Sequence, residues 1–292
     1  MAWQQLKISI KAEHAEAVGD MLSANQAQAV TFLDAKDTPM YEPKPGEVLL
    51  WPDTQVIGLY DASVNLVPII ERIGKASVFK HEFLYSIDQL EDKDWEREWM
   101  ENFHPMQFGK RLWICPSWRS APDPNAVNVL LDPGLAFGTG THPTTSMCLR
   151  WLDSQDIANK TVVDFGCGSG ILAIAALKLG AKSALGIDID PQALIASKSN
   201  AEQNHVNKQF SLYLADQQPD VQSDIVIANI LSGPLKTLKS KIASHCKSGG
   251  WLVMSGVLVE QAQDVVDAYS DEFQFDPIEQ EGEWARISAK KR

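Results

Sequence analysis

Residues 161–170 read Thr-Val-Val-Asp-Phe-Gly-Cys-Gly-Ser-Gly, and an unbroken apolar run, Ile-Leu-Ala-Ile-Ala-Ala-Leu, follows them. The first five residues have the apolar, β-branched pattern of a buried strand, and the later run is typical of a buried helix that Gly180 can end. Glycines between a strand and a helix permit unusual backbone angles and let a ligand approach main-chain N–H groups closely. We therefore predict a ligand-binding loop at Gly166, Gly168 and Gly170.

An acidic residue, Asp188, ends the next expected strand 18 residues after Gly170. A carboxylate at this place can accept hydrogen bonds from both hydroxyls of a ribose. The dinucleotide fingerprint G-x-G-x-x-G requires Gly or Ala three residues after its second glycine, whereas this chain has Ile171 there. The sequence also lacks the G-x-x-x-x-G-K-[ST] motif of P-loop proteins. These patterns favour an adenosine-containing cofactor and disfavour NAD, FAD and a P-loop nucleotide.

Strand and helix patterns alternate around this loop, which predicts a doubly wound α/β domain with a mostly parallel sheet of seven strands. The expected strands are Thr161 to Phe165, Ser183 to Ile187, Phe210 to Leu214, Asp224 to Ala228, Trp251 to Ser255, Phe273 to Ile278 and Trp284 to Ala289. The expected helices are Ile171 to Leu179, Pro191 to about Asn204, Pro234 to Cys246 and Val259 to Tyr269. Only Glu-Gln-Glu-Gly-Glu joins the last two strands, so we expect an antiparallel hairpin at the sheet edge.

Two other segments carry candidate binding residues. Leu131 to Thr145 reads Leu-Asp-Pro-Gly-Leu-Ala-Phe-Gly-Thr-Gly-Thr-His-Pro-Thr-Thr and enters the first helix of this domain. Its N–H and O–H donors could bind a cofactor carboxylate, or the segment could be a helix start capped by Thr141 or Thr144. Asn229 ends the fourth strand, where it could be a turn residue or could accept a hydrogen bond from a substrate amine.

The first 90 residues indicate a small α+β domain without a phosphate-binding loop. Glu91 to Asn102, Glu-Asp-Lys-Asp-Trp-Glu-Arg-Glu-Trp-Met-Glu-Asn, predicts a connecting helix that ends before His104-Pro105. We therefore expect domains at 1–90 and 105–292 joined by a helix at 91–104. Residues 1–104 carry 9 Lys/Arg and 18 Asp/Glu, whereas the remainder carries 17 and 20. The acidic first domain suits a basic protein partner or serves solubility, and it argues against nucleic acid.

The amino-acid composition indicates the broad class of protein. The chain has 292 residues, 45% of them hydrophobic, and a net charge of −12, which is ordinary globular material. Its four cysteines form no C-x-x-C pair and have no histidine at zinc-site spacing, so we expect neither a disulfide framework nor a metal. The chain start lacks a signal-peptide pattern and no run of about 18 apolar residues occurs, so we expect a cytoplasmic protein.

Together these segments resemble a known family. Asp164, Gly166, Gly168 and Gly170 with Asp188 and the edge hairpin resemble the class I S-adenosylmethionine-dependent methyltransferases. The run at 131–145, the segment Asn229-Ile-Leu-Ser and the 91–102 connector extend the likeness over the whole chain. It is similar to the bacterial methyltransferases that modify large-subunit ribosomal protein eleven, in which the last segment usually reads Asn-Ile-Leu-Ala.

This resemblance implies a Rossmann-like catalytic domain and a ferredoxin-like first domain that recognises the free ribosomal protein. It implies trimethylation of α-amino and lysine ε-amino groups, with S-adenosyl-L-methionine as cofactor. By position, the implied cofactor contacts are Thr145, Gly166, Gly168, Gly170, Asp188 and Asn229. Asn229 is also the implied catalytic residue, Asp216 is a weaker candidate for the adenine amine, and we expect a monomer without metal or membrane association.

The acceptor amine must be neutral before it can take a methyl group. At pH 7 a lysine of pKa ~10.4 is almost fully protonated, whereas an α-amine of pKa ~7.8 is roughly one-seventh neutral. His142 could act as a general base or could have a structural role. Three alternatives remain at this point: a methyltransferase for nucleic-acid bases or small amines, a nicotinamide-dependent oxidoreductase, and a non-catalytic protein that binds the donor.

Overall fold

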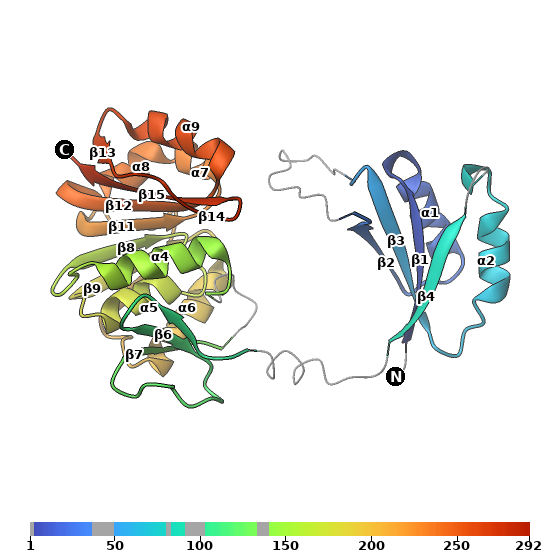
Figure 1. Cartoon of the computed structure of the whole chain (residues 1–292), viewed down its shortest axis with the longest axis horizontal. Helices are drawn as coiled ribbons and strands as arrows, with labels where there is room; N and C mark the ends of the chain where they lie inside the picture. Colours follow the sequence, from blue (N-terminus) through green and yellow to red (C-terminus); the bar gives the residue numbers. More distant parts are fainter. Residues whose placement is uncertain (1–2, 37–49, 80–82, 91–102, 133–139) are drawn as a thin grey trace. The chain divides into compact units, whose positions relative to one another are not determined.

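The computed structural model divides the chain into two compact units, residues 1–102 and 103–292. It describes residues 3–36, 50–79, 83–90, 103–132 and 140–292 (Figure 1). The division between the units falls inside the segment for which a connecting helix is predicted. Residues 91–102 of that segment lie outside the described residues, so the predicted helix stays a prediction. We describe each unit by itself.

The first unit is a four-stranded antiparallel sheet with two helices. Its elements are β1 (Trp3–Lys11), α1 (Ala12–Ala24), β2 (Ala29–Asp34), β3 (Asp53–Asp61), α2 (Val67–Gly74) and β4 (Leu84–Leu90). The strand order is β2-β3-β1-β4, and every adjacent pair is antiparallel. This β-α-β-β-α-β succession with that strand order is the topology called ferredoxin-like. Leu6, Ile8 and Tyr60 from the sheet pack with Val18 and Leu22 of α1, and all five are fully buried.

The apolar residues just before β4 belong to two different elements. Ser77–Phe79 forms a 3-10 turn and β4 begins only at Leu84. Phe79 and Phe83 stack 4.6 Å apart between centroids. Their apolar character therefore reflects packing in the core of this unit rather than strand formation.

The second unit is built on a parallel sheet that is covered on both faces. Its strands are β8 (Thr161–Phe165), β9 (Ser183–Asp188), β10 (Phe210–Leu214), β11 (Ser223–Asn229), β12 (Cys246–Leu258), β13 (Phe273–Phe275), β14 (Glu279–Glu281) and β15 (Trp284–Lys291). Their order is β10-β9-β8-β11-β12-β15-β13, with β14 also paired to β15. β8 to β12 are parallel to one another, whereas β15 is antiparallel to β12. The chain passes from β8 to β9 on one side and returns to β11 on the other, so the ligand-binding switch point lies between β8 and β11.

Six helices are described in this unit. They are α4 (Pro143–Ser154), α5 (Ile171–Lys178), α6 (Pro191–Gln203), α7 (Ser232–Thr237), α8 (Lys239–Ser244) and α9 (Val259–Tyr269). One buried cluster joins the sheet to α4, α5 and α6, and a second joins the opposite face to α7, α8 and α9. The predicted doubly wound α/β fold is thus confirmed. The helix expected from Pro234 to Cys246 is wrong in one respect, because the chain breaks at Leu238 into two short helices.

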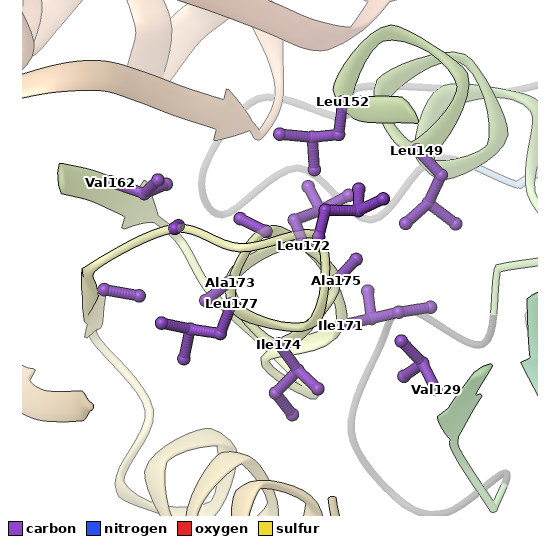
Figure 2. Close-up of a cluster of buried hydrophobic side chains, with 14 of the residues drawn as sticks. Val129, Leu149, Leu152, Val162, Ile171, Leu172, Ala173, Ile174, Ala175 and Leu177 are labelled. Atoms are coloured by element: carbon purple, nitrogen blue, oxygen red, sulfur yellow. The ribbon is translucent and has the colours of Figure 1, made fainter. Parts of the chain in front are cut away.

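From Ile171 to Leu177, helix α5 is apolar and buried on all sides, and only Lys178 at its end is exposed. Figure 2 shows Ile171, Leu172 and Ile174 pointing in different directions from it, and all three belong to the same buried cluster. The neighbours drawn there include Val162 of β8 and Leu149 and Leu152 of α4. A helix without a polar face cannot rotate or slide without exposing apolar surface, so it fixes the loop that precedes it.

The predicted edge hairpin is confirmed, but its connection differs from expectation. β13 and β15 pair antiparallel, and β15 lies between β12 and β13. The linking residues Glu279–Glu281 form strand β14, which pairs with β15 and brings the sheet to eight strands. Gly282 has φ 60° and permits the two-residue turn from Glu281 to Trp284. Charged residues are tolerated in β14 because it is an edge strand.

A three-stranded sheet at the start of the unit has no counterpart in the predictions. It consists of β5 (Met106–Phe108), β6 (Leu112–Cys115) and β7 (Val127–Leu130), and it packs against the cluster around α5. Asp153 of α4 ties this sheet to the domain. Its buried carboxylate accepts hydrogen bonds from the backbone N–H groups of Lys110 (2.6 Å) and Arg111 (3.2 Å).

We predict that Asp153→Ala lowers the free energy of unfolding of this unit by about 2–4 kcal/mol, because two backbone N–H groups and the Arg111 guanidinium lose a charged acceptor. Urea denaturation measures the change. Asp156→Ala is the control, since Asp156 is exposed and accepts a hydrogen bond from the Ala158 amide within its own turn, and we expect an effect within about 0.5 kcal/mol. Equal effects of the two substitutions would contradict this role of Asp153.

Candidate functional site

The glycine loop has the predicted position between β8 and α5. Gly166, Gly168 and Gly170 all have positive φ, at 79°, 53° and 76°. The amides of Gly166 and Cys167 donate to the carbonyl of Ile187 at 2.7 and 3.0 Å, which fastens the loop to β9. α5 begins directly after Gly170. The loop therefore stands at the N-terminus of a rigid helix, where backbone N–H groups can face a ligand.

Contacts within the protein itself also require glycine at two of these three positions. A Cβ atom on Gly166 would lie 2.3 Å from Cγ2 of Ile230, and one on Gly170 would lie 2.8 Å from Oγ of Ser197. Close packing against the segment after β11 and against α6 thus excludes side chains at both positions. Glycine at 166 and 170 is explained by packing and backbone angle, whether or not a ligand approaches there.

Asp188 lies at the end of β9 and against the glycine loop. Its Oδ2 accepts from the Gly168 amide at 2.9 Å, and its Oδ1 accepts from the Asp190 amide at 3.0 Å. A carboxylate has about four acceptor positions, so two remain after these contacts. The side chain is partly exposed. This geometry fits a group that receives two neighbouring hydroxyls, as the sequence predicts.

The structure brings Thr145 and Asn229 together, although 84 residues separate them. Thr145 is in the first turn of α4 and is 1% exposed, and Asn229 is the last residue of β11. The Asn229 amide nitrogen donates to Thr145 Oγ1 at 3.2 Å. Asn229 Oδ1 is buried and has no hydrogen-bond partner among the described residues. A buried acceptor without a donor is costly, and an incoming N–H group would satisfy it.

The start of α4 differs from both expected caps. His142 is the N-cap residue: its Nδ1 accepts from the Thr144 amide, and Pro143 occupies the first helical position. The expectation that Thr141 or Thr144 caps the helix is therefore wrong. The His142 ring stacks edge-on against Trp284 at 4.8 Å, and burial lowers its pKa. These contacts favour a structural role for a neutral imidazole. Residues 133–139 of the preceding segment lie outside the described residues.

Two residues near Asp188 bear on the cofactor prediction. Asp216 follows β10, is exposed, and is brought near Asp188 by a hydrogen bond from the Ala215 amide to the Asp188 carbonyl (2.9 Å). Ile189, which sequence reasoning missed, directly follows Asp188 and is 85% exposed. Beside a carboxylate that can hold a ribose, this apolar side chain could lie against the flat face of the attached base, since ligand sites are lined mainly by apolar groups. Its signal in the sequence is an isoleucine just beyond the end of a strand.

Asp164 of β8 is a buried acid directly before the loop. It is 1% exposed; Oδ2 accepts from the Ala173 amide at 3.1 Å, and Oδ1 has no partner among the described residues. Burial raises the pKa of Asp164 to about 7, since charge is disfavoured in this apolar environment, and the nearby charge of Asp188 adds to the increase.

The part of the chain that the structure describes gives no evidence for a metal site, a disulfide or a membrane-spanning helix. Within it, no group of three or more His, Cys, Asp or Glu side chains could hold a metal ion. All four cysteines are buried as free thiols. None of the described helices combines the length and apolar character needed to cross a membrane.

The sheet order, the glycine loop after its first strand and the acid after its second define a class I S-adenosylmethionine-dependent methyltransferase. The family model described as "Ribosomal protein L11 methyltransferase (PrmA)" matches residues 2–292. The chain belongs to this family.

Relatives of that name match the chain over its full length. The ribosomal protein L11 methyltransferase of Pseudoalteromonas atlantica is 64% identical over 292 residues, and that of Photobacterium profundum is 61% identical over 293, each covering 100% of both chains. The solved structure of a ribosomal protein L11 methylase from Lactobacillus delbrueckii subsp. bulgaricus is 31% identical, with a TM-score of 0.59. That likeness covers 65% of this chain and 98% of the other.

We predict that Asp164 makes stability depend on pH. Between about pH 4 and 7 the folded chain keeps a proton on Asp164 that the unfolded chain, with a pKa of 3.8, has already lost. The contribution of Asp164 to the free energy of unfolding is therefore full below pH 4 and declines as the pH rises towards 7. Asp164→Asn resembles the protonated acid and does not titrate, so its stability relative to the wild type should increase over this range.

Urea denaturation of both proteins at several pH values between 4 and 8 measures this difference. A difference in free energy of unfolding that stays constant from pH 4 to pH 8 would show that Asp164 is ionised in the folded chain.

Proposed function

We propose that this chain transfers methyl groups from S-adenosylmethionine to amino nitrogens of ribosomal protein L11. The observation that carries the proposal is the free Oδ1 of Asn229. It is buried, its amide is held by Thr145, and it stands at the same edge of the sheet as the glycine loop and Asp188. The full-length relatives named for L11 support the choice of substrate protein.

The residues present fit the methyl donor. The remaining acceptor positions of Asp188 would hold the two ribose hydroxyls, and Ile189 would lie against the adenine, with Asp216 near its amine. Gly166, Gly168 and Gly170 would let the donor approach the loop backbone. Thr145 and Asn229 would border the donor on its methyl side. When bound, S-adenosylmethionine supplies a sulfonium-linked methyl group that a neutral amine can take directly.

The protein's task is then to align an amine, exclude water and favour the neutral form of the amine. Asn229 Oδ1 can accept one N–H of the amine and direct the nitrogen lone pair towards the donor. A neutral α-amine is plentiful near pH 7, whereas deprotonating a lysine costs about 4–5 kcal/mol. Burial of the lysine would lower this cost, and its proton would leave to solvent before transfer. His142 is engaged as a helix cap, so we assign it no proton transfer.

We also propose the target amines, the unit that recognises the substrate protein and the oligomeric state. The family resemblance supports the α-amine and lysine ε-amines as targets, each methylated up to three times. Asn229 Oδ1 can orient the unmethylated and the monomethylated amine, because both carry an N–H when neutral. The neutral dimethylated amine has no N–H, so packing against the walls of the site must orient it for the third transfer. The first unit, with twice as many acidic as basic residues in 1–104, would recognise the free ribosomal protein. A protein that binds RNA phosphates must itself be basic, so the charges are complementary. We propose a monomer that acts in the cytoplasm without binding nucleic acid directly.

Incubating the chain with methyl-labelled donor and separated large-subunit ribosomal proteins tests the activity. Mass spectrometry should find label on L11, at amines, in increments of one to three methyl groups. Asn229→Ala should reduce the rate at saturating donor at least tenfold, because the amine loses its acceptor. Label on RNA or on a small amine instead of L11 would favour another methyltransferase. Donor binding without any transfer would indicate a non-catalytic protein.

Asp188→Ala should weaken donor binding by about 1.5–3 kcal/mol for each lost charge-assisted hydrogen bond, which raises the dissociation constant at least tenfold. Calorimetry measures it. The matched control is Asp220→Ala, whose side chain is 96% exposed and pairs only loosely with Lys241 at 3.9 Å, and we expect no change. An unaltered dissociation constant in Asp188→Ala would remove the ribose assignment.

A further inference from the structure

Ile230, the residue after Asn229, is held between the two strands that flank β11. β11 lies between β8 and β12 in the sheet. On the β8 side, Cγ2 of Ile230 occupies the space where a Cβ atom on Gly166 would lie, at 2.3 Å from it. On the β12 side, the backbone of Ile230 passes Gly256, where a Cβ atom would lie 2.5 Å from the Ile230 carbonyl oxygen and 2.8 Å from its carbonyl carbon. A side chain at either glycine would therefore clash with Ile230.

An irregularity in β12 at Gly256 leaves space for the backbone of Ile230. The pairing of β12 with β15 shifts register between Met254 and Val257, and Gly256 there has φ 81°. A bulge of this kind turns the strand locally and is a recurrent feature next to active sites. Ser255, which pairs with Asn229 across the sheet, is fully buried and donates to the carbonyl of Ala285 at 2.9 Å. The bulge is thus anchored, and the Ile230 peptide has no room to approach β12 further.

We propose that Ile230 and Gly256 are positioning residues that set the place of the Asn229 amide relative to the glycine loop. This inference rests on the proposed function. Asn229 is bonded directly to Ile230, so any movement of the Ile230 peptide moves the acceptor oxygen. The contact of Ile230 with Gly166 ties that same peptide to the donor side. Methyl transfer requires the amine nitrogen, the methyl carbon and the sulfur in line, so a small displacement of Asn229 reduces the rate more than it reduces donor binding.

Gly256→Ala tests the proposal, and β12 supplies a matched control. Gly249 lies in the same strand with φ 73°, but a Cβ atom there would meet nothing within 4 Å. Both substitutions introduce the same left-handed backbone strain, and only Gly256→Ala pushes against Ile230. We expect Gly256→Ala to lower kcat for L11 methylation at least tenfold while the donor dissociation constant changes less than threefold. Gly249→Ala should leave both values near those of the wild type.

Substitutions of Ile230 provide a second test that does not depend on the folding of Gly256→Ala. Ile230→Val keeps the γ-methyl group that contacts Gly166, whereas Ile230→Leu removes the branch at Cβ. We expect kcat to be nearly unchanged in the valine variant and to fall at least fivefold in the leucine variant, with the L11 KM and the donor dissociation constant within threefold of the wild type in both.

Three results would overturn the inference. Gly256→Ala could retain the wild-type kcat, Ile230→Leu could match Ile230→Val, or donor binding could weaken as much as kcat falls. The wild-type chain distinguishes these outcomes from failure of the proposed function. If it binds the donor and leaves L11 unlabelled, the proposed function is wrong and the inference falls with it. If it methylates L11 and the variants follow Gly249→Ala, only the positioning role is wrong.

Discussion

Burial of helix α5 on every side is the constraint on which the rest of the catalytic unit depends. The side chains of Ile171 to Leu177 fill the space between β8, β7 and α4, and all seven are buried. Because the helix cannot shift, Gly170 at its start has a fixed position, and so does the loop back to β8. The loop is further fastened to β9 through the Ile187 carbonyl and to Asp188 through the Gly168 amide. A flexible glycine segment is thereby made rigid by its surroundings.

The acceptor side of the site, where Thr145 and Asn229 would face the amine that takes the methyl group, is built differently. It depends on contacts between elements distant in the chain. Thr145 at the start of α4 holds the amide nitrogen of Asn229 at the end of β11. His142 caps α4 one turn earlier, so the position of Thr145 follows from the capping geometry. The donor side thus depends on one buried helix and its loop, whereas the acceptor side depends on how α4, β11 and β12 meet. Substitutions can therefore affect the two sides separately.

The sequence predicts the parts of this fold whose signal is local. The central strands β8 and β11 are apolar runs because they are buried on both faces. Asp190 with Pro191 identifies the start of α6, where Asp190 accepts from the Gln192 amide. β14 was not predictable in this way, since Glu-Gln-Glu resembles a loop until its pairing with β15 is known. The strands β5 to β7 are too short to show the alternation of apolar and polar residues that indicates a strand. The sequence indicates Thr145 and Asn229 one at a time as candidate site residues. The hydrogen bond between them depends on the packing of α4 against β11, which the sequence does not show.

Glycines show most clearly why a motif alone leaves the site incomplete. Gly166, Gly168 and Gly170 form a recognisable pattern, yet for Gly166 and Gly170 the groups that exclude a side chain belong to the protein, Ile230 and Ser197. Gly256 belongs to no pattern, and its need for glycine arises from a peptide on the neighbouring strand. A spacing rule detects the loop because its glycines are close in sequence. It cannot detect Gly256, because the contact that requires it forms only when β11 and β12 are side by side. The geometry that aligns donor and acceptor is therefore a property of the assembled sheet rather than of the loop motif.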